Sequence, residues 1–193
     1  GRGISLITGI EYLHAGKSKV HNQVWAALSH EGLGFPSLMI YRQDKQRPAL
    51  HEELELQRIA GLEMKPETLW KGGTPPIIQH GDFRFALLVC SELTNISYRA
   101  ALRGKVDALF VPEWNQDTET FNALVESAAL DVHAYIIQCN DRKYGDSRIR
   151  APFKDSWMRD VLRVKGGVTD YCVIGEIDVQ ALRQFQSSYR SSD

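Results

Sequence analysis

Apolar, β-branched runs recur along this chain, and several of them are nearly continuous rather than alternating with polar residues. Such runs predict strands that are covered on both faces, as in sheets that pack against helices or against a second sheet. The runs are Ile4–Leu13, Asn22–Ser29, Ser37–Tyr41, Phe83–Cys90, Ala108–Val111, Ala134–Cys139 and Tyr171–Ile177. The chain is therefore expected to fold around well-covered β-structure.

Helical patterns fit between the later runs. Thr118–Val132 repeats its apolar residues with the spacing of one helix face, and Asp117 stands where a helix cap belongs. Shorter helices are predicted over Ile96–Leu102 and Leu50–Ile59. Alternation of strand and helix in the second half predicts an α/β fold, whereas the first third has the pattern of antiparallel strands.

Size and composition are those of one soluble domain. The chain has 193 residues, of which 43% are hydrophobic and 24% charged, and its formal net charge is -1. We expect a single domain over residues 1–193, with a disordered tail over 187–193. No apolar run approaches the roughly 20 residues that span a bilayer, so no membrane partner is expected. Three cysteines without a C-x-x-C pair predict neither a disulfide framework nor a metal site, and favour a cytoplasmic setting. No cofactor motif is present.

The segment Phe85–Asn95 is the most informative for chemistry. An apolar strand runs into Cys90, and the chain becomes polar at once. Open α/β folds carry their chemistry at the carboxyl ends of strands, and the amides of Ser91 and Glu92 follow where an oxyanion would need donors. A lone cysteine is more often a small buried apolar residue, so position alone leaves both interpretations open.

A thiolate nucleophile needs a cation or a base nearby. Lys45 follows the strand that ends near Tyr41, and Glu52 and Glu53 come shortly after it. Lys45 can stabilise an oxyanion, and Glu53 can orient Lys45 or a substrate amine. A solvated charged loop is the simpler interpretation of the same residues.

Order and spacing along nearly the whole chain resemble the nitrilase, or carbon–nitrogen hydrolase, superfamily. Lys45-x-x-Pro-Ala with a glutamate at 53 is followed by Cys90-Ser-Glu-Leu. Three more segments match in order: Arg99-x-x-x-Arg103-Gly-x-x-Asp107-Ala-Leu-Phe-Val-Pro112, Ala128-Ala-x-x-x-x-Ala134-Tyr-Ile-Ile-x-x-Asn140, and Val173-Ile-Gly-Glu-Ile-Asp178.

The resemblance implies a four-layer α-β-β-α sandwich and hydrolysis of an amide-type C–N bond through a cysteine thioester. It implies that Cys90 is the nucleophile and that Lys45 is the oxyanion-stabilising lysine. It assigns the additional glutamate to Glu53, with Glu52 as the alternative, and part of the oxyanion hole to the amide of Ser91. Glu92, Glu11 and Asn140 are further candidates for the pocket.

One departure concerns the general base. In the family this glutamate lies on a segment before the strand that corresponds to Ile4–Ile10, and the chain starts at Gly1. We therefore expect a domain that lacks its first strand–helix segment and is inactive or incompletely folded in isolation. A homo-oligomer or an intramolecular partner domain is expected from the resemblance alone.

The segment from Arg142 to Lys165 is locally basic. It holds eight basic residues against Asp146, Asp155 and Asp160. Such a segment can contact an anionic substrate or nucleic acid, although few aromatic residues accompany it and a solvated surface explains it as well. Together with Cys90-Ser-Glu-Leu, the segment also resembles the nitrilase-like part of bacterial reverse-transcriptase polypeptides that act in phage defence. A C–N hydrolase is thus the first hypothesis. A non-catalytic assembly or ligand-sensing module, or a domain associated with a nucleic-acid enzyme, is the alternative.

Overall fold

The computed structural model describes residues 3–32, 34–167 and 172–190. The chain divides into two compact units, Gly1–Gly73 and Thr74–Asp193. Within the described residues, one sheet belongs to the first unit and one to the second.

The first unit is built on a long antiparallel sheet. Its strands β1 (Leu6–His14), β2 (Lys19–His30) and β3 (Ser37–Asp44) pair in the order β1-β2-β3. The short strand β4 (Glu63–Met64) lies parallel to β2 at its start. The prediction of antiparallel strands in the first third of the chain is therefore confirmed.

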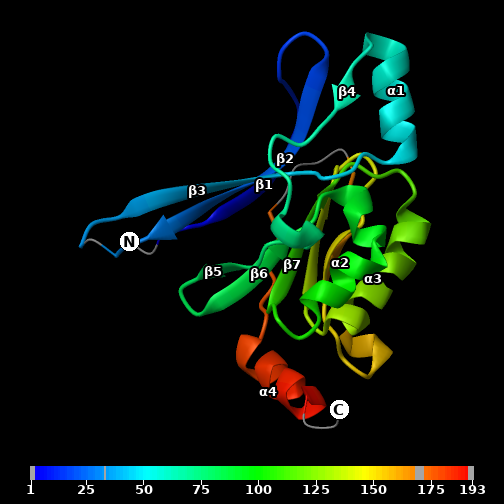
Figure 1. Ribbon diagram of the computed structural model, residues 1–193. Coiled ribbons are helices and arrows are strands. Elements are labelled where there is room, and N and C mark those ends of the chain that lie inside the picture. Colours follow the sequence, from blue (N-terminus) through cyan, green and yellow to red (C-terminus); the bar gives the residue numbers. More distant parts are fainter. Residues whose placement is uncertain (1–2, 33, 168–171, 191–193) are drawn as a thin grey trace. The chain divides into compact units, whose positions relative to one another are not determined.

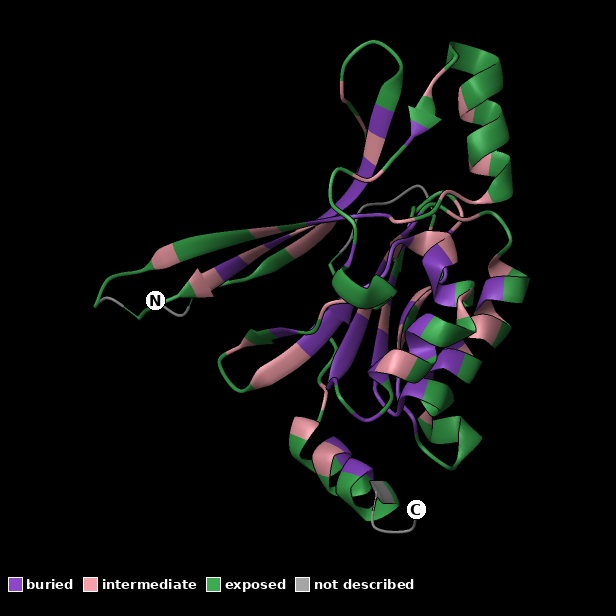
Figure 2. Ribbon diagram, in the orientation of Figure 1, coloured by how far each residue is buried: buried purple, intermediate pink, exposed green. Residues whose placement is uncertain are grey.

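Helix α1 (Leu50–Ala60) follows β3 in the first unit. The carboxylate of Glu52 accepts the Ala49 N–H at 3.0 Å, which satisfies one of the donors that a helix start leaves unpaired. The helix ends at Gly61, whose φ of 60° is the left-handed conformation that glycine tolerates best. No residue of α1 is buried, as Figure 2 shows.

The second unit contains a six-stranded mixed sheet in the order β10-β9-β8-β7-β6-β5. Its central strands β6 (Phe83–Leu87), β7 (Ala108–Glu113) and β8 (Tyr135–Asn140) are parallel. The flanking strands are antiparallel to their neighbours: β5 (Ile78–His80), β9 (Ser147–Arg150) and β10 (Asp160–Val164). The carboxyl ends of the three parallel strands therefore lie at one edge of the sheet.

Two crossover helices cover one face of this sheet. Helix α2 (Ile96–Leu102) connects β6 to β7, and α3 (Thr118–Val132) connects β7 to β8. Both crossovers move along the sheet in the same direction, so their right-handedness places both helices on the same face, as in Figure 1. Three 3₁₀ turns complete the regular structure: η1 (Lys71–Gly73), η2 (Cys90–Thr94) and η3 (Ser156–Met158).

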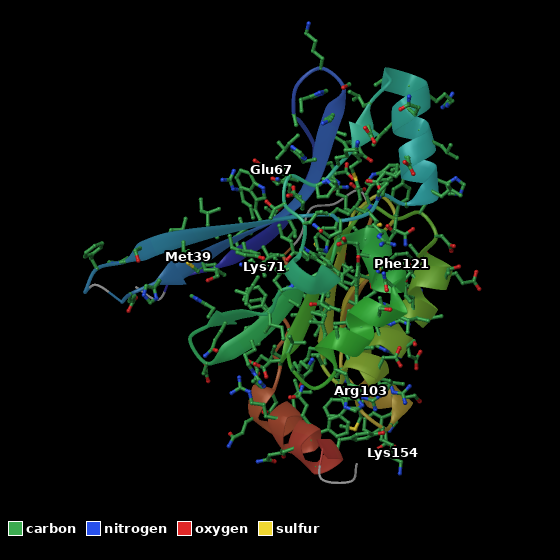
Figure 3. All side chains as sticks on the ribbon, viewed as in Figure 1. Met39, Glu67, Lys71, Arg103, Phe121 and Lys154 are labelled. Atoms are coloured by element: carbon green, nitrogen blue, oxygen red, sulfur yellow. The ribbon has the colours of Figure 1, made fainter. Side chains whose placement is uncertain are left out.

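The core of the second unit lies between the sheet and these helices. The fully buried residues include Leu109, Val111 and Ile136 from the strands and Val125 and Ala128 from α3. Phe121, which Figure 3 labels at the start of α3, is also buried. The spacing predicted for α3 is therefore the spacing of its buried face, and the predicted bounds of α2 and α3 are confirmed.

The expected strand over Tyr171–Ile177 is wrong for its described part, because residues 172–177 form no strand, and Tyr171 lies outside the described residues. A Cβ on Gly175 would lie 2.8 Å from Ile149 Cδ1 and 3.3 Å from Leu162 Cβ. Gly175 therefore lies close to side chains of β9 and β10, while Val173 and Ile174 are exposed.

The chain then forms α4 (Val179–Arg190), which the sequence pattern had not suggested. Gln186 fastens this helix by donating to the carbonyls of Val106 and His133 at 2.9 and 2.7 Å. Residues 187–190 of the expected tail form the last turn of α4, and residues 191–193 lie outside the described residues.

Candidate active site

Lys45 is a buried cation at the end of β3. Its backbone N–H donates to the Asn22 carbonyl at 2.8 Å, which extends the pairing of β3 with β2 by one residue. Its side chain is 2% exposed, and its ammonium forms an ion pair with Glu52. The solvated charged loop that was the alternative for Lys45 is therefore excluded.

The carboxylate of Glu52 accepts hydrogen bonds from four residues around Lys45, including Lys45 itself. Its Oε2 accepts from Lys45 and from the Ala49 N–H, and its Oε1 accepts from Asn22 at 3.0 Å and from Tyr12 at 3.4 Å. Burial raises the pKa of the Glu52 carboxyl, but the Lys45 charge and the hydrogen bonds from Lys45, Ala49 and Asn22 outweigh it and hold the pKa below its ordinary value. Glu52 is therefore a carboxylate that fixes the lysine.

Glu53 does not take this role. It is exposed on α1, and the ion pair of Lys45 runs to Glu52 instead. The sequence favoured Glu53 as the partner of Lys45 and left Glu52 as the alternative. The partner in the structure is Glu52. Glu11 is exposed on β1, beside Tyr12, whose pKa its charge helps to raise.

Cys90 lies in a sharp turn at the carboxyl end of β6. The Leu88 N–H still donates to the Phe110 carbonyl of β7 at 3.0 Å, and two residues later η2 begins. Cys90 itself has a φ of 49°, in the left-handed region that side chains other than glycine rarely adopt. Strained residues of this kind are concentrated at functional sites, because the surrounding structure must hold them in place.

Glu92 holds this turn. It is 3% exposed, and its carboxylate accepts the Val89 N–H at 2.8 Å, on the residue just before Cys90. Ser91 stands in the first turn of η2, where backbone N–H groups have no acceptor within the helix. The turn thus supplies a half-buried thiol, a backbone donor beside it and a carboxylate that fixes the backbone.

Asn140 ends β8 at the same edge of the sheet. Its amide donates to the Asn115 and Gly145 carbonyls at 2.9 and 2.8 Å, and its oxygen accepts the Asn115 and Asp141 N–H groups at 2.9 Å each. It therefore ties together the loops that follow β7 and β8.

Glu113 ends β7 in the same unit, and the sequence analysis missed it. It is buried at 9% exposure, and its Oε1 accepts from Gln138 of β8. Its Oε2 and the Gln138 Oε1 have no hydrogen-bond partner among the described residues. Burial raises the Glu113 pKa to about 7, against the lowering effects of Gln138 and Arg148. The sequence did contain a signal for this residue: Glu113 is an acidic residue at the end of an apolar strand, and that strand is the next one after the strand that leads to Cys90.

The other two cysteines lack these features. Cys139 and Cys172 are exposed, whereas Cys90 is half-buried. Partial burial of the sulfur and the nearby Glu113 raise the pKa of the Cys139 thiol. Neither residue has a positive φ among the described backbone.

The basic segment 142–165 is largely neutralised inside its own unit. Arg148 and Arg150 are buried, and Asp146, Asp160 and Glu126 pair with them. Glu126 also pairs with Arg159, and Asp146 also pairs with Arg163. Much of the basic excess therefore serves the packing of β9 and β10 against α3.

Within the described ranges, no three or more His, Cys, Asp or Glu side chains form a group that could hold a metal ion. The helices of the described residues are all too short or too polar to cross a membrane.

Comparisons with known proteins give structural likeness without a close sequence relative. No family model and no curated protein matches the chain. One similar structure is XC1258 from Xanthomonas campestris, a CN-hydrolase superfamily protein with an arsenic adduct in its active site. Its TM-score is 0.69 at 12% identity, and the match covers 97% of this chain and 67% of that one.

A second similar structure is an amidase of the nitrilase superfamily from Nesterenkonia, in a cysteine-to-alanine variant. Its TM-score is 0.64 at 17% identity, over 99% of this chain and 68% of the amidase. A glutamate-to-glutamine variant of that amidase, with acrylamide added to its active-site cysteine, matches at TM-score 0.61 and 16% identity over 98% and 69%. The chain thus has an α/β fold of the nitrilase type and spans about two thirds of the length of these proteins.

Proposed function

We propose that this chain carries the nucleophile and the oxyanion-stabilising lysine of a thiol-dependent hydrolase that acts on amide-type C–N bonds. The observation that carries the proposal is the turn at Cys90: a half-buried thiol with a left-handed backbone, at the carboxyl end of a parallel strand. The fold around it is shared with amidases whose active sites contain a cysteine.

The proposed reaction proceeds in two steps. The Cys90 sulfur attacks the amide carbon, the N–H of Ser91 and the Lys45 ammonium stabilise the negative charge on the oxygen, and the C–N bond breaks. The thiol proton leaves with the departing ammonia or amine. Water then cleaves the thioester, releasing the carboxylic acid and restoring the thiol.

Labelling of the three cysteines tests the nucleophile. Acrylamide and iodoacetamide are applied near neutral pH, and the modified peptides are quantified by mass spectrometry over time. We expect Cys90 to react faster than Cys139 and Cys172, although both of those are exposed. Equal, slow reaction of all three would contradict the proposal and favour the non-catalytic module.

Release of ammonia from butyramide, which is bound in another structure of the Nesterenkonia amidase, tests turnover. The resemblance assigns the general base to a segment before Ile4, so the assay is run on this chain and on any longer natural polypeptide that contains it. Cys90→Ala should abolish release, and Cys139→Ala should leave it unchanged. Release that survives Cys90→Ala would refute the assignment.

The proposal also requires the Lys45 ammonium and the Cys90 sulfur to meet in one cavity. A short reagent with one thiol-reactive and one amine-reactive end, attached first at Cys90, should link to Lys45. Lys105, which belongs to the second unit together with Cys90 and has an exposed ammonium, is the control lysine. A crosslink to Lys105 and none to Lys45 would refute this part of the proposal.

A further inference from the structure

Strand β1 contains a bulge at Glu11 and Tyr12. Pairing with β2 is regular from Leu6 to Ile10 and resumes at Leu13, so that these two residues face Asn22 alone. Tyr12 has a φ of 51°, a conformation that costs an aromatic residue on the order of 1 kcal/mol or more. A strained tyrosine in an otherwise regular strand indicates that its side chain is needed where the bulge places it.

The bulge directs two side chains to the same atom. The Tyr12 hydroxyl donates to Glu52 Oε1 at 3.4 Å, and Asn22 Nδ2, from the opposite strand, donates to that oxygen at 3.0 Å. The other oxygen, Oε2, holds the Lys45 ammonium and the Ala49 N–H. One oxygen is therefore fixed by the bulge, and the other faces the lysine.

The charges around Tyr12 keep it a hydrogen-bond donor. Burial raises the pKa of the Tyr12 hydroxyl, and the charges of Glu52, Glu11 and Glu55 raise it further. Glu52 and Glu55 come from α1, Glu11 comes from β1, and Lys45 follows β3. In this acidic surrounding the neutral phenol donates to a carboxylate and adds no negative charge.

We propose that Tyr12 is a positioning residue for the Lys45–Glu52 ion pair. Its hydroxyl, delivered by the bulge, fixes the rotation of the Glu52 carboxylate so that Oε2 stays directed at the Lys45 ammonium. The role in turnover rests on the proposed function. The effect on Glu52 rests on the geometry of the first unit alone.

Carbon-13 NMR titration of the Glu52 carboxyl group tests the geometry without any substrate. Tyr12→Phe removes only the hydroxyl, and we expect the Glu52 pKa to rise because the carboxylate loses a donor. Tyr41→Phe is the matched control, since the Tyr41 hydroxyl also donates at 3.4 Å, but to the neutral side chain of Gln43. A Glu52 pKa that is unchanged in Tyr12→Phe, or raised equally in Tyr41→Phe, would overturn the inference.

Kinetics with butyramide then test the positioning role. We expect Tyr12→Phe to lower kcat about tenfold while KM changes less than about twofold, because the lysine acts on the developing oxyanion. The free energy of unfolding, measured in urea, should stay close to that of the unaltered chain, since ring and backbone are kept. Full kcat in Tyr12→Phe would overturn the role. Absence of turnover in a longer natural polypeptide that contains this chain, with Tyr12 unaltered, would count against the proposed function, while the titration still decides the inference.

Discussion

At the residue scale, the burial of Lys45 makes its partner as important as its own charge. An ammonium at 2% exposure is costly unless a carboxylate pairs with it, and Glu52 is that carboxylate. The sequence predicted that a glutamate near Lys45 orients it and preferred Glu53 to Glu52, whereas the ion pair runs to Glu52. Neighbouring residues of a helix point about 100° apart, so spacing along the chain cannot decide between Glu52 and Glu53 before the start of α1 is known.

Replacing Glu52 and Glu53 separately by glutamine distinguishes their roles. We expect Glu52→Gln to lower the free energy of unfolding by about 3 kcal/mol, because Lys45 is left as a buried charge without its counter-ion. Glu53→Gln, on the exposed side of α1, should change it by less than about 0.5 kcal/mol. Urea denaturation of both variants at pH 7 makes the comparison. Equal losses would show that the ion pair does not carry this part of the fold.

Glu113 gives the second unit a pH-dependent stability. Its pKa is raised from the ordinary value of 4.5 to about 7 in the folded chain, so the folded state binds the proton more tightly than the unfolded state. Stability therefore falls as the pH rises from about 4.5 to about 7, and it changes no further from this group above that range.

Glu113→Gln should remove this contribution. The variant should match the unaltered chain near pH 4 and exceed it by up to about 3 kcal/mol near pH 8, since glutamine stays neutral at both. Urea denaturation across this pH range measures the difference. Asp117→Asn, at an exposed carboxylate with a lowered pKa, is the control and should not reproduce the effect. A stability difference that is the same at both pH values would contradict the assigned pKa.

At the element scale, the two crossover helices of the second unit were the most predictable part of the chain, whereas α4 was not predicted. Both α2 and α3 have the predicted bounds, because an apolar stripe and a capping side chain mark a helix locally. Strands β5, β9 and β10 were missed, because they are short and because β9 carries two buried arginines, Arg148 and Arg150, whose partners include acidic residues elsewhere in the sequence. Pairing of this kind depends on tertiary contacts that no local pattern contains.

The cap of α2 affects the turn that carries Cys90, because η2 leads directly into this helix. Asn95 Oδ1 accepts the Ser97 and Tyr98 N–H groups at 3.0 and 3.4 Å. We expect Asn95→Ala to lower the free energy of unfolding by about 1 kcal/mol, as measured in urea, and Asn95→Asp to retain most of it because the accepting oxygen remains. An equal loss in both variants would mean that the cap is not the relevant contact.

At the scale of the whole molecule, charge is organised as buried or partly buried pairs within each unit. The net charge of -1 gives no indication of this, and the local excess of basic residues at 142–165 suggested a surface rather than an interior. Arg148 and Arg150 lie inside, paired with acidic residues of α3 and the adjoining strands. The convergence of Lys45 and Cys90 stays a prediction, because the two residues belong to different units.

One of these ion pairs joins α4 to the centre of the second sheet. Asp107, just before β7, is 0% exposed, and Arg183 of α4 donates to its two oxygens at 2.9 and 2.6 Å. Burial raises the Asp107 pKa, but the hydrogen bonds from Arg183 and the Arg84 N–H, together with both charges, outweigh it and hold the pKa below its ordinary value. The stability that this carboxylate contributes is therefore present above its ordinary pKa and is lost as the pH falls through the lowered one.

Arg183→Met should destabilise the chain clearly at pH 7, and the difference from the unaltered chain should shrink as the pH is lowered, because protonated Asp107 no longer needs a cation. Arg103→Met is the matched control. The guanidinium of Arg103, labelled in Figure 3, lies 5.5 Å from the centre of the Tyr189 ring of α4, and among the described residues it forms no ion pair with a buried carboxylate. It should show a smaller loss with no such pH dependence. Urea denaturation at several pH values measures both. If the two losses depend on pH in the same way, then α4 is held by packing, and the buried carboxylate does not determine its attachment.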